Sequence, residues 1–233
     1  MPRIVVLGCG TAVGKTRVSV ALLRALRSRG CATLGLKPIE SGVAQPGANG
    51  SDAAALNEAS SLNPHDVAEP LYALAAPVSP HLAARVAGVE LEVAQVESWV
   101  KSAEAKVAPH VGPHRAIWTV IESAGGVFSP LSMSATNFDL AQALEPAIWL
   151  LVAADRLGVL HDVSATMQAL QGRARLPDHV VLSVAHEPDP STGTNAAELA
   201  ALGIVTPRAV LARNDDRGIE PLADLLLAQH GGH

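Results

Sequence analysis

The chain has 233 residues, of which 48% are hydrophobic and only 3% aromatic, and its formal net charge is −5. This length suits one α/β domain, and the scarcity of aromatic residues means that the core is aliphatic, as in helices packed on a parallel sheet. The acidic balance, without clusters of Lys and Arg, excludes a nucleic-acid surface. No apolar run of about 18 residues marks a membrane span, and the first residues lack the features of a secretory signal.

The chain contains two cysteines, Cys9 and Cys31. Two thiols provide neither a disulfide framework nor a four-ligand metal site, so the expected compartment is a reducing cytoplasm. Cys9 lies close to the start of a predicted helix, whose dipole acts to lower the pKa of a thiol, but we expect Cys9 to serve only as a small side chain in the loop.

Apolar runs of strand length alternate with amphipathic segments of helix length. The interleaving implies parallel strands joined by right-handed crossovers, and hence one α/β domain over residues 1–233 with a mostly parallel sheet flanked by helices. Residues 39–50, with three glycines and one proline, are expected to form a loop, and Ser51 to cap the helix that follows. The expected strands are residues 3–7, 33–37, 115–121, 147–153, 180–184 and 205–211. The expected helices are residues 16–29, 51–57, 92–107, 161–170, 193–202 and 219–229.

A glycine-rich loop joins the first expected strand to the first expected helix. Residues 8–16 have the sequence GCGTAVGKT, with five residues between Gly8 and Gly14, one more than in the common P-loop pattern. Glycines allow backbone N–H groups to surround phosphate oxygens, and the helix N-terminus adds the positive end of its dipole. Lys15 is expected to reach the β- and γ-phosphates and Thr16 to bind Mg²⁺. The sequence therefore predicts a P-loop nucleoside triphosphatase domain that binds ATP and Mg²⁺.

Together with this loop, four further segments resemble the dethiobiotin synthetase family, in the same order and at similar spacing. They are residues 37–42 (KPIESG), 50–56 (GSDAAAL), 79–83 (SPHLA) and 122–131 (ESAGGVFSPL). Members of this family convert 7,8-diaminopelargonate, CO₂ and ATP into dethiobiotin, ADP and phosphate through a carbamate that ATP phosphorylates. The resemblance therefore implies an ATP- and Mg²⁺-dependent ligase of biotin biosynthesis that acts as a homodimer in the cytoplasm.

The resemblance also implies roles for individual residues. Lys15 and Lys37 are implied to be catalytic, as cations around the transferred phosphoryl group. The metal-binding residues that it implies are Thr16, Asp52 and Glu122. The nucleotide-binding residues that it implies are Gly10, Thr11, Ala12, Val13, Gly14, Lys15, Thr16, Glu122, Gly125, Gly126, Ala185 and His186. The substrate-binding residues that it implies are Thr11, Ser41, Ser79, Gly158 and Leu160, the last two in a loop that meets the substrate's carboxylate across a dimer interface.

Structural explanations compete with several of these roles. Lys37 is equally a residue type that ends strands in solvent, and Ser41 one that forms turns. Asp52 has the position of a carboxylate that stabilises a helix dipole, and Ser79 precedes a proline that can start a helix. For Glu122 the sequence favours the functional role, because this residue ends an apolar strand, where an unpaired charge is costly.

Three positions depart from the family pattern. Ala12 stands where the family usually has Glu, and Glu40 is a candidate to take over that charge. The Asn that recognises the purine is missing: Ala185 stands there and His186 follows, so ATP is the default nucleotide but another triphosphate stays open. Ser123 replaces a common Gly.

Two alternatives to the synthetase remain open from the sequence. A nucleotide-binding paralogue with weak or no activity would agree with the changes at Ala12 and Ala185. A regulatory or partitioning ATPase would share the fold, but such proteins typically carry an extra lysine near the start of the loop, where this chain has Cys9 and Gly10.

Overall fold

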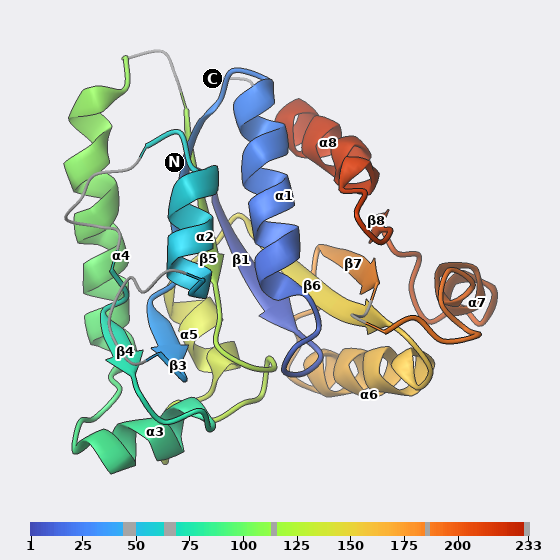
Figure 1. Cartoon of the computed structure of the whole chain (residues 1–233), viewed down its shortest axis with the longest axis horizontal. Coiled ribbons are helices and arrows are strands. Elements are labelled where there is room, and N and C mark those ends of the chain that lie inside the picture. The colour runs from blue at the N-terminus through green and yellow to red at the C-terminus, as the bar shows by residue number, and fades with distance from the viewer. Residues whose placement is uncertain (44–49, 63–68, 113–115, 185–186, 231–233) are drawn as a thin grey trace.

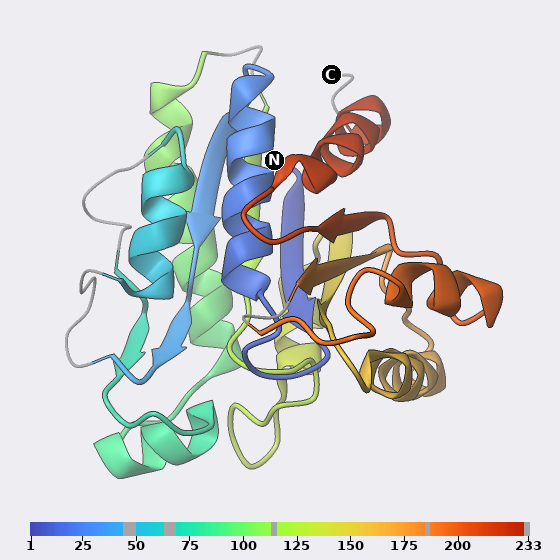
Figure 2. The ribbon, with the colours of Figure 1, turned by 45° about the vertical axis from the view of Figure 1, so that its right-hand side comes forward.

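A six-stranded parallel sheet forms the centre of the molecule, with helices on both of its faces (Figure 1, Figure 2). The computed structural model describes residues 1–43, 50–62, 69–112, 116–184 and 187–230. The strand order is β2-β5-β1-β6-β7-β8, so β1 lies in the interior of the sheet. The strands are β1 (Arg3–Gly8), β2 (Ala32–Leu36), β5 (Ile117–Glu122), β6 (Ile148–Asp155), β7 (His179–Val184) and β8 (Ala209–Leu211).

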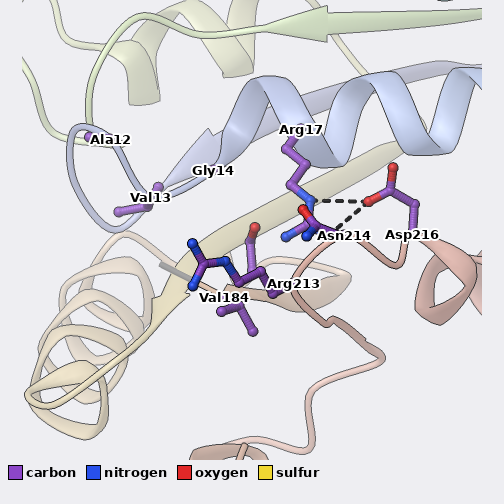
Figure 3. A pocket seen from close by; sticks show the side chains of 9 residues that line it. Ala12, Val13, Gly14, Arg17, Val184, Arg213, Asn214 and Asp216 are labelled. Carbon is purple, nitrogen blue, oxygen red and sulfur yellow. Dashed lines mark hydrogen bonds and ion pairs between the residues drawn. The ribbon is translucent and has the colours of Figure 1, made fainter. Parts of the chain in front are cut away.

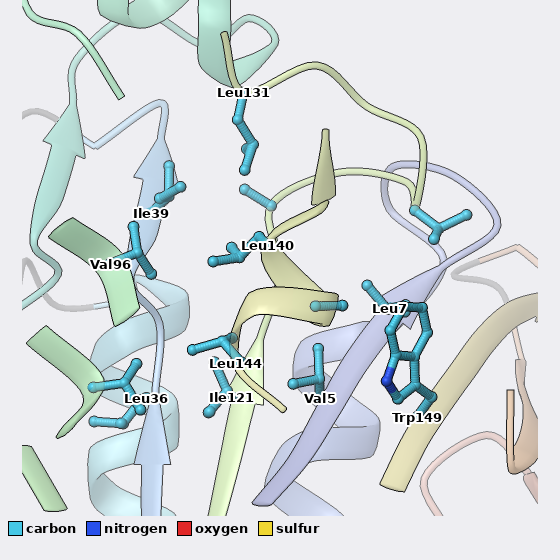
Figure 4. Packing of buried hydrophobic residues seen from close by; sticks show 14 of the residues in the cluster. Val5, Leu7, Leu36, Ile39, Val96, Ile121, Leu131, Leu140, Leu144 and Trp149 are labelled. Atoms are coloured by element: carbon cyan, nitrogen blue, oxygen red, sulfur yellow. The ribbon is translucent and has the colours of Figure 1, made fainter. Parts of the chain in front are cut away.

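Successive side chains of the inner strands lie on opposite faces of the sheet and are buried in two separate cores. In β1, Val5 and Leu7 belong to one core, whereas Ile4 and Val6 belong to the other. The first core is completed by α4 (Val93–Val107) and α5 (Asn137–Ala143), and Figure 4 shows its side chains between these helices and the sheet. The second core is completed by α1 (Lys15–Ser28), α2 (Asp52–Ala59) and α8 (Glu220–His230).

The remaining helices lie toward the ends of the sheet. Residues of α6 (Val159–Gly172) and α7 (Asn195–Ala201) form a small third cluster with Ala153 and Leu182. The helix α3 (Pro80–Ala87) begins at the Ser-Pro step, and its apolar side packs into the first core. In the part of the chain that the structure describes, no helix has the length and apolar character needed to cross a bilayer.

The expected elements agree with the structure apart from their boundaries and a few omissions. Ser51 does cap α2, since its side chain accepts a hydrogen bond from the Ala54 N–H. The prediction of a loop over residues 39–50 was wrong at its start, because β3 (Ile39–Ser41) pairs in parallel with β4 (Tyr72–Leu74) in a second, small sheet. The expected strand 205–211 begins only at Ala209, and α5 was missed because its seven residues are too few to show a helical period.

The register of the parallel strands brings functional side chains together at one edge of the sheet. Leu36 of β2 is paired with Ile121 of β5, so the next residues, Lys37 and Glu122, lie side by side. Glu122 is in turn paired with Val6 of β1, close to the start of the glycine-rich loop. Ligands of open α/β sheets bind at this carboxyl edge, where the crossovers diverge.

Candidate active site

The glycine-rich loop turns sharply between β1 and α1. Gly14 adopts a left-handed conformation (φ 91°) as the N-cap of α1, and Ala12 is also left-handed (φ 56°). A Cβ added to Gly14 would lie 2.5 Å from the Ser183 Oγ, so only glycine lets the loop rest on β7. Beside the loop, a Cβ on Gly126 would lie 3.3 Å from the Gly10 Cα, which shows how closely the two backbones approach. The loop conformation thus depends on glycine at its last position.

Two carboxylates and one ammonium form the polar centre of the site. The Lys37 Nζ lies 2.6 Å from the Glu122 Oε1 and 2.9 Å from the Asp52 Oδ2, and it donates a further hydrogen bond to the Ser123 carbonyl. The Thr16 hydroxyl lies 2.8 Å from the Asp52 Oδ1 and 2.9 Å from the Glu122 Oε1. Burial lowers the pKa of Lys37, but the two carboxylates more than offset this, and its net pKa is raised. Lys37 is therefore a paired, buried cation and not a solvated strand-end lysine.

Lys15 differs from Lys37, because in the part of the chain that the structure describes no carboxylate lies at hydrogen-bonding distance from its buried ammonium. Its side chain is only 7% exposed, and its Nζ approaches the Gly10 carbonyl at 3.5 Å. Burial and the nearby charge of Lys37 lower its pKa to about 8, although Glu122 and Asp52 act in the opposite direction. The Lys15 ammonium is therefore placed to donate hydrogen bonds to phosphate oxygens, because a bound phosphate would offset both its desolvation and its repulsion from Lys37.

The arrangement fits a magnesium ion held partly by the protein and partly by a phosphate. The Glu122 Oε2 is buried and has no hydrogen-bond partner among the described residues, which is costly for a carboxylate oxygen. Its neighbours Asp52 and Thr16 offer further oxygen ligands for a metal ion. No cluster of three His, Cys, Asp or Glu suited to a metal occurs within the described ranges, but Mg²⁺ needs only one or two carboxylates when phosphates and water complete its shell.

Glu40 positions Asp52 through the backbone. Its carboxylate accepts hydrogen bonds from the N–H groups of Asp52 (2.6 Å) and Ala53 (3.3 Å) at the start of α2. Burial raises the pKa of Glu40, and these two hydrogen bonds oppose the rise. Both of its oxygens are thus engaged with the first turn of α2, and Glu40 caps this helix in addition to lining the site.

A cavity of about 430 Å³, here named the phosphate cavity, collects most of the predicted site residues. Glu40, the candidate to replace the charge missing at Ala12, also lines it, as does Ala124, for which the sequence predicted no role. The predicted residues that line this cavity are Thr11, Ala12, Val13, Gly14, Lys15, Thr16, Lys37, Ser41, Asp52, Glu122 and Gly125. The fold thus gathers residues from four separate stretches of the chain around one space.

Three of the predicted substrate-binding residues lie outside the lining of the phosphate cavity. Ser79 is the N-cap of α3, and its Oγ forms a 3.0 Å hydrogen bond with the Nδ1 of His81. Gly158 is the exposed N-cap of α6, and Leu160 is half-buried in the first turn of that helix. His161, next to it, is exposed. Any contact of these residues with a substrate therefore needs a ligand that extends beyond the cavity.

A second cavity of about 570 Å³ lies on the other side of the loop and shares Ala12, Val13 and Gly14 with the first. Figure 3 shows these loop residues on one side and Arg213 and Asn214 on the other. Ala185 and His186, predicted to contact the base, lie outside the described residues. The remaining lining residues, all missed from the sequence, are Arg17, Ser183, Val184, Arg213, Asn214 and Asp216. No local pattern marks them, because three distant segments form this cavity only after β7 and β8 have joined the sheet.

The thiol of Cys9 has a raised pKa, although it lies near the start of α1. Its side chain packs against the apolar clusters around Leu7 and Val159, and burial raises the pKa of its thiol to about 11. Its N–H donates to the Val152 carbonyl, 2.9 Å away. Desolvation of the thiolate thus outweighs the helix dipole.

We therefore expect Cys9 to resist alkylation at neutral pH. A thiol with a pKa of about 11 is almost wholly protonated at pH 7, and its thiolate fraction rises only as the pH approaches 11. Mass spectrometry of the Cys9 peptide after brief iodoacetamide treatment at increasing pH measures this directly. Rapid labelling at pH 7, in a chain that remains folded by circular dichroism, would contradict the burial of the thiol.

Comparisons with known proteins show which proteins this chain is similar to. A family model described as an AAA domain matches residues 2–216. The ATP-dependent dethiobiotin synthetase BioD of Anaeromyxobacter sp. (strain K) is 40% identical over 222 residues, which cover 93% of this chain and 92% of that protein. BioD 1 of Salmonella typhi, an ATP-dependent dethiobiotin synthetase, is 34% identical, with 94% of this chain and 91% of that protein covered.

Solved structures confirm the fold. The MinC:MinD cell division protein complex of Aquifex aeolicus aligns with a TM-score of 0.57 over 98% of this chain and 96% of that one, at 10% identity. The cell division ATPase MinD of Pyrococcus furiosus aligns with a TM-score of 0.55 at 17% identity, covering 98% and 100% of the two chains. At these identities the likeness concerns the fold alone, and it confirms the expected α/β P-loop fold.

Proposed function

This chain belongs to the family of ATP-dependent dethiobiotin synthetases, and we propose that it closes the ureido ring of dethiobiotin from 7,8-diaminopelargonate, CO₂ and ATP. The observation that carries the proposal is the placement of two buried lysines, Lys15 and Lys37, beside an orphaned carboxylate oxygen of Glu122 in one cavity. Phosphoryl transfer requires such fixed positive charge around the moving group.

The two cavities divide the nucleotide between them. The triphosphate occupies the phosphate cavity, where backbone N–H groups of the loop and the Lys15 ammonium face its oxygens. The nucleoside occupies the second cavity, because the two spaces share the loop residues 12–14 and a ligand that crosses these residues enters both. Thr16, Asp52 and Glu122 are the residues that would hold Mg²⁺, which would neutralise charge on the phosphate oxygens.

The remaining chemistry uses the two amines of the substrate. One amine attacks CO₂, forms a carbamate and loses a proton to solvent; a carbamate oxygen then takes the γ-phosphoryl group and ADP departs. The second amine attacks the carbamoyl carbon and loses a proton to the departing phosphate, which closes the ring. Lys37 lies in the phosphate cavity beside Ser41, and in this position the two would hold the carbamate next to the γ-phosphate.

The substrate's carboxylate is bound by a second copy of the chain in this proposal. Gly158 and Leu160 do not line the phosphate cavity, and the neighbouring Leu157 is 75% exposed. An exposed leucine beside a helix N-terminus suits a homodimer in which the start of α6 receives the carboxylate of a substrate bound to the partner. The reaction is placed in the cytoplasm, where ATP is available.

A product assay tests the proposed function. We expect dethiobiotin, detected by mass spectrometry, when the protein is mixed with Mg²⁺, bicarbonate, 7,8-diaminopelargonate and ATP. Parallel reactions with CTP, GTP and UTP determine the base preference, which the missing Asn leaves open. Absence of product with all four nucleotides, at protein concentrations that bind ATP, would leave a nucleotide-binding paralogue as the explanation.

A further inference from the structure

Arg17 joins α1 to the loop of residues 212–216, which lines the second cavity. Arg17 follows Thr16 in the first turn of α1, and its guanidinium contacts residues 212–216 after β8. It donates to the Asp216 Oδ1 from both Nε (3.0 Å) and an Nη (2.9 Å), and to the carbonyls of Ala212 and Asp215. Figure 3 shows Arg17 extended from the helix toward Asp216.

The loop of residues 212–216 has a fixed shape of its own. The Asp215 N–H donates to the Ala212 carbonyl, and the Asp215 carboxylate accepts from both the N–H and the side chain of Arg217. Asn214, at its tip, is left-handed with φ 57°. A Cβ on Gly218 would lie 2.0 Å from the Val210 carbonyl oxygen, so the chain beyond the loop packs tightly on β8. The internal contacts set the shape of the loop, and Arg17 sets its position relative to the phosphate cavity.

We propose that Arg17 is a positioning residue for nucleotide recognition: it holds residues 212–216 so that Arg213 and Asn214 face the nucleoside across from the glycine-rich loop. Both side chains line the same cavity as Ala12–Gly14, which is where the proposed function places the nucleoside, and the inference rests on that placement. Within the described residues of this cavity, Asn214 supplies the amide with which a base edge can be recognised. The guanidinium of Arg213 is suited to stacking on a base.

Arg17 should contribute more to nucleotide binding than to the stability of the fold. The side chains of Arg17 and Asp216 are 28% and 43% exposed, and ion pairs of such exposure contribute little to folding. Without Arg17, however, the nucleotide itself would have to fix the position of the loop relative to α1, and the cost would reduce the binding free energy. The affinity for a nucleotide should therefore fall while the affinity for a bare polyphosphate should not.

Binding of two ligands to the full chain tests this inference. By titration calorimetry with Mg²⁺ present, we expect Arg17→Ala to weaken ATP binding about tenfold and to leave binding of inorganic tripolyphosphate, which does not reach the loop, nearly unchanged. Arg17→Lys should recover only part of the loss, because an ammonium lacks the planar fork that serves Asp216 and two carbonyls together. Asp216→Ala should weaken ATP binding in the same way, and the double variant should be little worse than Arg17→Ala alone.

Arg29 provides the matched control. It lies directly after α1, at the opposite end of the helix, and joins it to α8 through Glu220 and Asp224. We expect Arg29→Ala to bind both ligands as the wild type does. Equal losses of ATP and tripolyphosphate affinity in Arg17→Ala, or no loss of either, would overturn the inference while leaving the proposed function intact. A wild-type chain that binds neither ligand would instead overturn the proposed function and the inference with it.

Discussion

Lys37→Met should lower the rate of dethiobiotin formation about 100- to 1,000-fold, the usual effect of removing one group that stabilises transition-state charge. Methionine keeps the length of the stem and removes only the ammonium. In the wild type this ammonium lies between Glu122 and Asp52 in the phosphate cavity, where the proposed carbamate and γ-phosphate meet. A discontinuous assay of product at saturating substrates measures the loss in kcat.

The same substitution should also destabilise the protein. Glu122 is 1% exposed, so loss of Lys37 leaves a buried carboxylate without its cation, which costs about 3 kcal/mol, since Asp52 is partly exposed and adds less. Urea unfolding without ligands measures the free energy of unfolding. Lys101→Met is the control, because Lys101 pairs with Glu97 on the surface of α4 and should change neither rate nor stability appreciably. A Lys37 variant with wild-type kcat would show that the site is misplaced.

Lys15→Met should cause a loss of kcat of about the same size, accompanied by weaker ATP binding, because this ammonium lies against the glycine-rich loop, 3.5 Å from the Gly10 carbonyl. Its effect on stability should differ in sign. The pKa of Lys15 is lowered to about 8 in the folded chain, so burial of its charge opposes folding at neutral pH, and this penalty disappears as the pH rises above the unfolded value of 10.5.

We therefore expect the free energy of unfolding of Lys15→Met at pH 7 to equal or exceed that of the wild type, in contrast to Lys37→Met. The two variants thus form an internal comparison in which the two catalytic losses are similar and the stabilities diverge. Urea unfolding of both at pH 7, without nucleotide, measures the difference. Similar destabilisation by both substitutions would contradict the view that Lys37 is paired and Lys15 is poised for phosphate.

Much of the site was predictable because it depends on short-range order along the chain. A strand, a glycine-rich turn and Gly-Lys-Thr at a helix start predict the phosphate loop from local chemistry alone. The positions of Lys37 and Glu122 at strand ends were also predictable, because the carboxyl ends of parallel strands share an edge. What the sequence could not supply was the register, which places these two side chains 2.6 Å apart.

The parts that were missed depend on tertiary contacts between distant segments. Arg17 gives no signal as one arginine among many polar residues of an amphipathic helix, and its partners follow almost 200 residues later. The raised pKa of Cys9 was not predictable, because the helix dipole is evident from sequence position, whereas burial is not. The short strands β3 and β4 were missed because three residues are too few to establish alternation.

The fate of oxygen from CO₂ tests the central claim, that this site phosphorylates a carbamate. A carbamate made from ¹⁸O-labelled CO₂ donates one of its oxygens to the phosphoryl group, and ring closure breaks the bond between that oxygen and the carbamoyl carbon. Reactions with the wild-type protein, labelled CO₂, 7,8-diaminopelargonate and ATP should therefore release phosphate that carries one ¹⁸O, together with dethiobiotin labelled in its ureido carbonyl. Phosphate without the label, released while dethiobiotin forms, would contradict the account.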